Sequence, residues 1–337
     1  MTLASLLALA ASSPAQTVPE RKAAPLQSAL GAPQQAVFFR GSIWVLSCWR
    51  ACDRARSFGG LVQLSTPGGK VLRRIPMGTP GALASADGAL WVADFWTGRV
   101  DRIDPGSGRV VASVWLKLPR PFAPGDSAFL PSSMSAGGGS VWVSTARGRL
   151  AQIDARSGLL TRTIGAPAYA TGELAADSRG VWVAEDVLGL GHVGRDGGQL
   201  HIHSFAAPYR HRVTANALAV GGGLVWILGG YAMRTLAGGP NSWVSTSAAT
   251  VTAVEQRTGS VRYQLRLRGA PYQALYADGA LLVADLRSGR MLRIDRHFSI
   301  RSILIGHGLD ALLLVRRGVI WATSARGGLR RVAIPGV

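Results

Sequence analysis

The chain has little lysine and few acidic residues, yet its net charge is strongly positive. Its 337 residues contain 37 Lys and Arg against 18 Asp and Glu, and lysine occurs only as Lys22, Lys70 and Lys117. Nearly all of the formal charge of +19 is therefore carried by arginine. Two interpretations stay open: selection for an anionic partner, or GC-rich codon usage without functional meaning.

Cysteine is almost absent. Only Cys48 and Cys52 occur, in the segment SCWRAC. No nearby Cys or His would complete a four-ligand metal site, which argues against structural zinc. If the protein is exported, a short-loop disulfide between Cys48 and Cys52 is expected, and two free thiols are the alternative.

The chain also lacks a hydrophobic run long enough to span a bilayer, and it shows no sustained helical periodicity. Its first apolar run, Leu3 to Ala11, is nine residues long. Small residues precede a candidate cleavage point after Ala15, although the usual positive n-region is missing. We expect residues 1–15 to be a signal peptide, residues 16–22 a linker, and the protein to be secreted or associated with the cell envelope.

A short apolar motif with a central tryptophan recurs along the chain. It reads GSIWV (41–45), GALWV (88–92), GSVWV (139–143), GVWV (180–183), LVWI (224–227), GALLV (279–283) and GVIWA (318–322). The anchors at the central position are Trp44, Trp91, Trp142, Trp182, Trp226, Leu282 and Trp321. Repeats of about 40–45 residues are typical of β-propellers.

Each repeat can be divided into four expected strands. After the anchor strand comes a loop that ends in Gly, then a strand closed by a turn such as IDPGSG (103–108) or IDARSG (153–158). A third strand follows, then a Gly-x-Pro step such as Gly78-Thr79-Pro80, and another short strand precedes the next anchor. Anchor strands such as SVWVS are apolar on both faces, which indicates sheets that are covered on both sides.

The seventh repeat ends after three strands. Its missing strand has a candidate near the N-terminus, because Gly31-Ala32-Pro33 repeats the step that elsewhere follows a fourth strand. The sequence thus predicts an all-β, seven-bladed β-propeller of four-stranded blades, covering residues 23–337 as a single domain. Residues 23–30 are expected to complete the last blade and close the ring.

The unit LWVAD…GRVDRIDPGSGRVV (90–111) resembles the YVTN/NHL-like β-propeller repeats of exported bacterial proteins, and more distantly the streptogramin B lyase-like propellers. The resemblance covers about residues 23–337 and implies a seven-bladed scaffold that binds through one face of the ring. Propellers with this consensus serve many purposes. The metal-binding and catalytic His/Glu set of the lyases has no clear counterpart here, so that activity is not carried over.

Two sets of chemically active residues have plain structural alternatives. Asp94, Glu185 and Asp285 lie three residues past their anchors and could line a cation site, or each could accept hydrogen bonds from the following loop. His201 and His203 lie on an expected outer strand, where solvent-facing side chains are the alternative to a metal site.

Arginine and aromatic residues gather in the loops that a propeller would place on one face, which includes the two longest insertions, 118–133 and 229–248. Guanidinium groups pair with carboxylates, sulfates or phosphates, and aromatic faces stack on sugars. Solvated arginine on a generally basic surface is the alternative. The candidate ligand-binding rim comprises Arg50, Arg54, Trp96, Arg147, Tyr209, Arg210, His211, Arg212, Tyr231, Arg234, Trp243, Tyr272, Arg287 and Arg326.

No P-loop, G-x-S-x-G, H-E-x-x-H or Cys-rich metal motif occurs in the sequence. We therefore expect a monomeric binding scaffold without cofactor, metal or catalytic residues, whose rim binds an anionic polymer, a glycan or another protein. No feature favours specific nucleic-acid recognition. The alternative is a lyase- or hydrolase-like enzyme with its site at the mouth of the central channel, for which Asp94, Glu185, Asp285, His211 and His307 are candidates.

Overall fold

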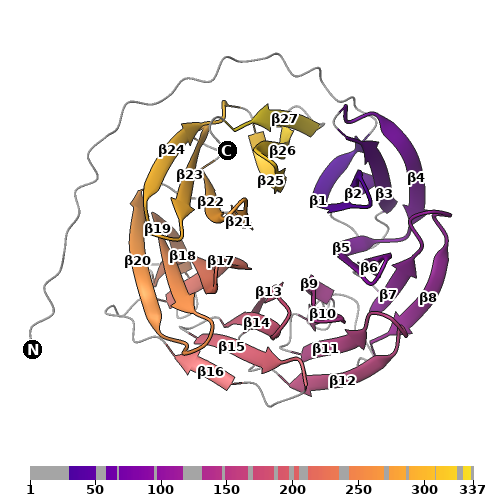
Figure 1. The fold of residues 1–337 in the computed structure, drawn as a ribbon, viewed down its shortest axis with the longest axis horizontal. Helices are drawn as coiled ribbons and strands as arrows, with labels where there is room; N and C mark the ends of the chain where they lie inside the picture. The colour runs from indigo at the N-terminus through magenta and orange to yellow at the C-terminus, as the bar shows by residue number, and fades with distance from the viewer. Residues whose placement is uncertain are drawn as a thin grey trace, which may run out of the picture.

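The computed structural model of the protein is a closed ring of seven small antiparallel sheets, arranged radially around a central axis (Figure 1). No helix among the described residues is long and apolar enough to cross a membrane. The described residues are 30–50, 58–66, 68–94, 97–116, 131–145, 149–165, 170–185, 189–196, 201–204, 212–234, 243–268, 273–285, 288–307, 309–324 and 329–334.

Each sheet is one blade whose strands follow in chain order from the axis outward (Figure 1). Blades 1 to 3 consist of β1 (Ala32–Phe39), β2 (Ser42–Arg50), β3 (Phe58–Ser65), β4 (Val71–Met77); β5 (Pro80–Ala86), β6 (Ala89–Asp94), β7 (Arg99–Ile103), β8 (Val110–Trp115); and β9 (Pro131–Gly137), β10 (Ser140–Thr145), β11 (Arg149–Asp154), β12 (Leu160–Gly165). Blades 4 and 5 consist of β13 (Ala170–Ala176), β14 (Gly180–Glu185), β15 (Gly189–Gly194), β16 (His201–Ser204); and β17 (Arg212–Gly221), β18 (Leu224–Arg234), β19 (Trp243–Glu255), β20 (Val261–Arg268). Blades 6 and 7 consist of β21 (Gln273–Ala277), β22 (Ala280–Asp285), β23 (Arg290–Asp295), β24 (Ile300–Leu304); and β25 (Leu309–Arg316), β26 (Val319–Ser324), β27 (Leu329–Ala333).

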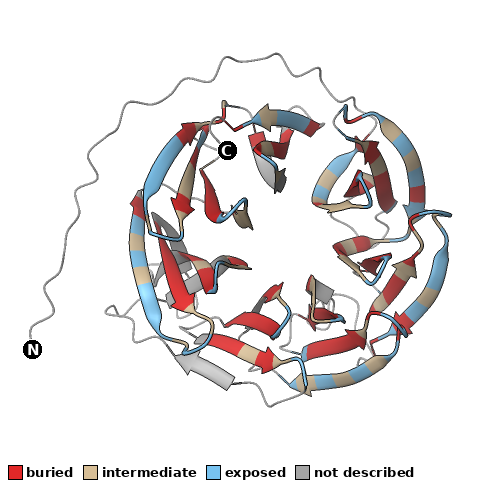
Figure 2. Ribbon diagram, viewed as in Figure 1, coloured by how far each residue is buried: buried red, intermediate tan, exposed pale blue. Residues whose placement is uncertain are grey.

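The hydrophobic core lies in the seams between blades rather than in one central mass (Figure 2). Every predicted anchor is buried, with exposed fractions from 0% to 3%. Each anchor packs into the following blade: Trp91, for example, contacts Val141 and Val143 of blade 3. This wedge explains why anchor strands are apolar on both faces, because both faces of a blade contact a neighbour.

Ring closure is visible in the seam between blades 7 and 1. Trp321 of blade 7 clusters with Ile43 and Val45 of blade 1, as the other anchors do with their neighbours. The Arg316 guanidinium carbon lies 3.3 Å from the centroid of the Phe38 ring across the same seam, a cation–π contact. The predicted propeller of seven blades is therefore confirmed.

The predicted closing strand falls largely outside the described residues. The seventh sheet contains three strands within the described chain, and residues 23–29 of the predicted strand are not described. Leu30, where the described chain begins, is buried in the seam between blades 7 and 1, and its carbonyl accepts a hydrogen bond from the Ser47 hydroxyl. The closing strand stays a prediction.

The turns between third and fourth strands form as the Asp–Gly pattern predicts. In blade 2, the Asp104 carboxylate accepts the amide of Gly106 at 3.2 Å, the amide of Ser107 at 2.9 Å and the Ser107 hydroxyl at 2.7 Å. The turn ends at Gly108, whose φ of 73° is costly for residues with a Cβ. Blade 6 has Phe298 at the equivalent point, with φ 63°, stacked on Tyr263 of blade 5 at 4.4 Å.

Candidate functional site

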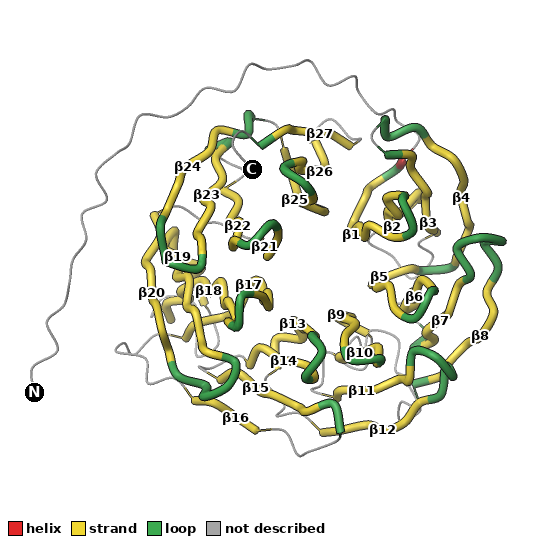
Figure 3. Tube along the Cα trace, viewed as in Figure 1, coloured by secondary structure: helices red, strands yellow, loops and turns green. Residues whose placement is uncertain are grey.

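The strand ends define two faces of the ring. Because strands alternate in direction, second strands end and third strands begin on the same face as the links between blades. We call this the loop face, and the opposite one, which carries the tight turns drawn as loops in Figure 3, the turn face. In blade 2, Asp94 at the end of β6 binds both Thr79 of the preceding link and Thr97 of the following loop. Link and loop therefore meet, as the sequence predicted.

Asp94 and Asp285, two of the acids that follow the anchors, accept hydrogen bonds from amides of the following loop. Asp94 accepts the Thr97 amide at 2.8 Å and the Thr79 hydroxyl at 2.8 Å. Asp285 lies 3.4 Å from the Ser288 amide as acceptor. The side chain of Glu185 lies outside the described residues. For Asp94 and Asp285, the geometry supports the turn interpretation over a cation site, and no cluster of three His, Cys, Asp or Glu occurs in the described part of the chain.

Most of the predicted rim falls outside the described residues. Arg50 is exposed at the end of β2, beside Trp49, whose ring meets Phe58 edge-on at 5.6 Å. The structure places the backbone, but not the side chains, of Arg212, Tyr231, Arg234 and Trp243. The rim residues outside the described chain are Arg54, Trp96, Arg147, Tyr209, Arg210, His211, Tyr272, Arg287 and Arg326.

Blade 5 brings together the rim residues whose backbone is placed. Its strands β18 and β19 have 11 and 13 residues, whereas β14 of the neighbouring blade has six. The insertion 229–248, expected as a loop, is therefore partly an extension of the sheet toward the loop face. In its ladder Arg212 lies opposite Ala232 and Arg234 lies opposite Trp243. Residues opposite each other, or two apart on one strand, share a sheet face, so the register assigns Arg212, Arg234 and Trp243 to one face of this blade-5 extension.

The other residues predicted from the sequence are the two cysteines, the paired histidines and the insertion 118–133. Cys48 is disulfide-bonded. Its expected partner Cys52 lies outside the described residues, so that pairing remains a prediction. The histidines His201 and His203 lie on β16, the outermost strand of blade 4, as the sequence predicted. The insertion 118–133 is described only from residue 131 onward.

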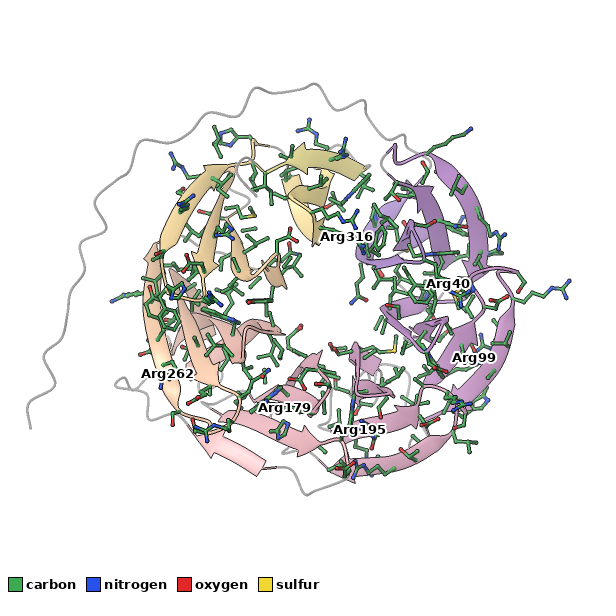
Figure 4. All side chains as sticks on the ribbon, viewed as in Figure 1. Arg40, Arg99, Arg179, Arg195, Arg262 and Arg316 are labelled. Atoms are coloured by element: carbon green, nitrogen blue, oxygen red, sulfur yellow. The ribbon has the colours of Figure 1, made fainter. Side chains whose placement is uncertain are left out.

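The arginines labelled in Figure 4 lie at separate places around the ring. Ion pairs between described side chains join Arg99 to Asp101 at 3.0 Å and Arg102 to Asp87 at 3.7 Å. Other carboxylates are engaged by turn amides: hydrogen bonds within the turns lower the pKa of Asp104 to about 2 and also lower the pKa of Asp154. Much of the arginine charge is therefore uncompensated by described carboxylates.

Glu173, on the innermost strand of blade 4, is a partly buried carboxylate that the sequence does not single out. It is only partly exposed, and burial raises the pKa of its carboxyl. It forms no hydrogen bond or ion pair with any described residue. Its segment ATGELAA carries no motif, and its position in the ring depends on a strand irregularity that a sequence pattern does not reveal.

No protein-family model and no curated protein sequence matches the chain. Several solved structures share its fold at low identity. A catalytically inactive virginiamycin B lyase from Staphylococcus aureus with quinupristin is 14% identical, with a TM-score of 0.65 over 93% of this chain and 98% of that one. Hydrazine synthase from Kuenenia stuttgartiensis is 12% identical, with a TM-score of 0.67 over 95% and 99%. BamB from Moraxella catarrhalis is 13% identical, with a TM-score of 0.54 over 89% and 96%.

These likenesses concern the fold. Proteins with such different names share the architecture, so the ring by itself does not select an activity. The chain is similar in fold to both lyase and BamB propellers, and it is a β-propeller.

Proposed function

We propose that the protein is an exported, non-enzymatic binding scaffold whose loop face binds an anionic glycan. The observation that carries this proposal is the register of the blade-5 extension, which assigns Arg212, Arg234 and Trp243 to one sheet face. Two guanidinium groups suit sulfate, phosphate or carboxylate substituents, and an indole on the same sheet face suits the face of a sugar ring.

The charge balance supports an anionic partner. The described carboxylates of Asp94 and Asp104 accept hydrogen bonds from loop and turn amides, and that of Asp101 pairs with a single arginine. Basic residues still outnumber acidic residues in the sequence, 37 to 18, so the surface keeps an excess of positive charge. A surface with this balance attracts polyanions at long range, and the attraction weakens as salt is added. The disulfide at Cys48 is consistent with an oxidising compartment outside the cytoplasm.

Heparin is a suitable probe, measured by calorimetry across a salt series. We expect affinity to fall at least about tenfold between about 50 and 200 mM salt. Replacing Arg50, Arg212 and Arg234 together by Ala should lower the slope of log affinity against log salt by about two to three, one per lost ionic contact. Trp243→Ala should weaken binding with little change in that slope, because it removes a neutral contact.

The matched control removes the same charge from the other face. Arg109, Arg156 and Arg257 are exposed residues in turns of the turn face, and their joint replacement by Ala should leave heparin affinity nearly unchanged. Equal losses in both triple variants would show that binding follows net charge alone, and a salt-independent affinity would contradict the electrostatic proposal.

A lyase- or hydrolase-like activity is the alternative. Two of its candidate residues, Asp94 and Asp285, have their carboxylates turned to loop amides, which leaves them poorly suited to act on a substrate. A likeness of fold to virginiamycin B lyase at 14% identity does not offset this. We therefore favour binding without catalysis.

A further inference from the structure

The outermost strand of blade 2, β8, exposes apolar side chains on the outside of the ring (Figure 2). Three of its large apolar residues are exposed: Val110, Val111 and Trp115, with exposed fractions of 50%, 52% and 56%. Each other outermost strand whose side chains are described has at most one such residue. Apolar residues that gather on one exposed strand indicate an interaction surface, whereas single ones do not.

The outer edge of β8 is also unprotected. It is the last strand of its sheet, and no strand of the described chain pairs with its outer side. Open edges are usually protected by charged residues or proline. Strands β4, β12, β20 and β24 contain arginine, and β16 contains two histidines. The sequence of β8, VVASVW, has no charged residue, histidine or proline, so its edge is open to pairing with another strand.

The backbone of β8 directs hydrogen-bonding groups toward this edge. The Leu116 amide donates to the Gly98 carbonyl at 3.0 Å, so Leu116 faces the sheet. In an antiparallel ladder, residues whose N–H and C=O face the partner alternate with residues whose groups face away. The ladder with β7 is regular from Ala112 to Trp115. The N–H and C=O groups of Ser113 and Trp115 therefore face the open edge, where an added strand can bind them without breaking a bond of the ring.

The start of β8 is positively charged. Arg109, the residue before the strand, is exposed. The Arg73 side chain of β4 lies on the same turn, where it donates to the Gly106 carbonyl at 2.7 Å. Asp104 supplies the carboxylate of this turn, and its oxygens accept amides of the turn itself. Two arginines against one carboxylate leave this end of β8 complementary to acidic side chains.

These features together define a partner. We propose that the open edge of β8 binds an extended segment of another protein, in which alternating apolar residues are followed by acidic residues at the C-terminal end. Antiparallel pairing is the more stable kind, and it places the C-terminal end of the added strand beside Arg109. Main-chain bonds to Ser113 and Trp115 hold the segment, and its apolar side chains pack beside Val111 and Trp115.

A second copy of the chain is a poorer occupant of this edge, because each copy has a net charge of +19 and the two would repel. The edge lies on the outside of the ring rather than on the loop face (Figure 1). The proposal therefore does not rest on glycan binding by the blade-5 extension.

The test is calorimetric titration of the full chain with a capped peptide in which valine alternates with threonine and glutamates follow at the C-terminal end. This peptide should bind. A peptide with the glutamates moved to its N-terminal end should bind more weakly, because they no longer lie beside Arg109. N-methylation of the peptide amides that face β8 should abolish binding, since it removes main-chain donors. Hydrogen exchange at the amides of Ser113 and Trp115 should slow in the complex.

Val111→Asp should weaken peptide binding about tenfold or more, because it places a negative charge in the apolar contact. Leu72→Asp on β4 is the matched control. Leu72 is 53% exposed and, like Val111, is the unpaired residue at the register shift of an outermost strand. It changes the net charge equally and should leave peptide affinity nearly unchanged. Trp115→Ala, which removes the other apolar contact, serves as a second variant if Val111→Asp folds poorly.

Three results would overturn the proposal: no binding of the acidic-ended peptide, equal binding of its N-methylated form, or equal losses in Val111→Asp and Leu72→Asp. Analytical ultracentrifugation examines the competing occupant. A dimer of the unmodified protein that Val111→Asp dissociates would assign the edge to a second copy of the chain and would also overturn the proposal.

Discussion

At the scale of single residues, the tryptophan anchors act by apolar burial rather than by polar bonding. The indole nitrogens of Trp44, Trp91, Trp142 and Trp226 are buried and have no hydrogen-bond partner among the described residues. A buried N–H without a partner is unfavourable, so the ring must gain more from indole volume in the seam than it loses at the nitrogen. The anchor position therefore selects for size and shape.

Trp142 tests this directly. Trp142→Ala should lower the free energy of unfolding by about 3–5 kcal/mol, because it opens a large cavity in the seam between blades 3 and 4. Trp142→Phe should cost clearly less, since no hydrogen bond is lost. Trp115, at the exposed end of β8 with 56% of its surface accessible, is the control: Trp115→Ala should change stability by less than about 0.5 kcal/mol. Chemical denaturation measures the unfolding free energy of all three variants. Equal losses for Trp142→Ala and Trp115→Ala would contradict the packing of Trp142 between blades 3 and 4.

At the scale of elements, the turns between third and fourth strands determine how the sheet edges are held. Asp104 accepts hydrogen bonds from two amides and a hydroxyl of its own turn, and these bonds lower its pKa to about 2. Asp154 of blade 3 and Asp295 of blade 6 likewise accept amides of their own turns. The recurring acids of the repeat consequently support the fold rather than form a shared site.

The lowered pKa of Asp104 gives a stability that depends on pH. A carboxylate whose pKa is lower in the folded state stabilises the fold above its unfolded pKa of about 3.9, and this contribution is lost as pH falls toward 2. Asp104→Ala should therefore reduce the midpoint of urea unfolding at pH 7, and its difference from the unmodified protein should shrink between about pH 5 and pH 2. A difference that stays constant over this range would show that the carboxylate charge does not matter.

The blade-5 extension is the second feature at this scale. Strands β18 and β19 continue past the level at which other blades end. Long hairpins beyond the shared ring need no contacts with neighbouring blades, so they can vary without disturbing the seams. This freedom is the physical reason why we propose the blade-5 extension as the place of recognition.

At the scale of the whole molecule, stability depends on closure of the ring. The cluster around Trp321 and Ile43 and the stacking of Arg316 on Phe38 join the last blade to the first. Leu30 is buried in this seam as well, at the start of the described chain. A ring with one open seam would expose apolar surface on both sides of the gap.

Two truncations test closure. Removal of residues 1–22 should leave the unfolding free energy unchanged, because the predicted closing strand begins at residue 23. Removal of residues 1–30 should lower it by more than about 3 kcal/mol, since it deletes that strand and Leu30 from the seam. Circular dichroism during thermal and urea unfolding measures both. If the two truncations have equal stability, the closing strand does not exist.

The fold could be predicted from the sequence because the signals that specify a blade lie within a single repeat. Every blade has an anchor, several blades also have the Asp–Gly turn or the Gly-x-Pro step, and these signals act within about 45 residues. The loop face could be predicted as well, because four antiparallel strands in each blade place the links between blades and the loops after the anchor strands on the same face. The extension of the sheet by residues 229–234 and 243–248 could not be predicted, because these segments lack the alternation of apolar and polar residues by which strands are predicted.

The repeats alone determined that this chain forms seven radial sheets wedged apart by tryptophan, since burial of one anchor per unit requires a neighbour on each side. Only the tertiary structure decided that Asp94 faces its own loop, that Arg212, Arg234 and Trp243 share a sheet face, and that the first strand of blade 4 has a register shift beside Glu173. Register, bulges and contacts between blades depend on segments far apart in the sequence, and no local pattern encodes them.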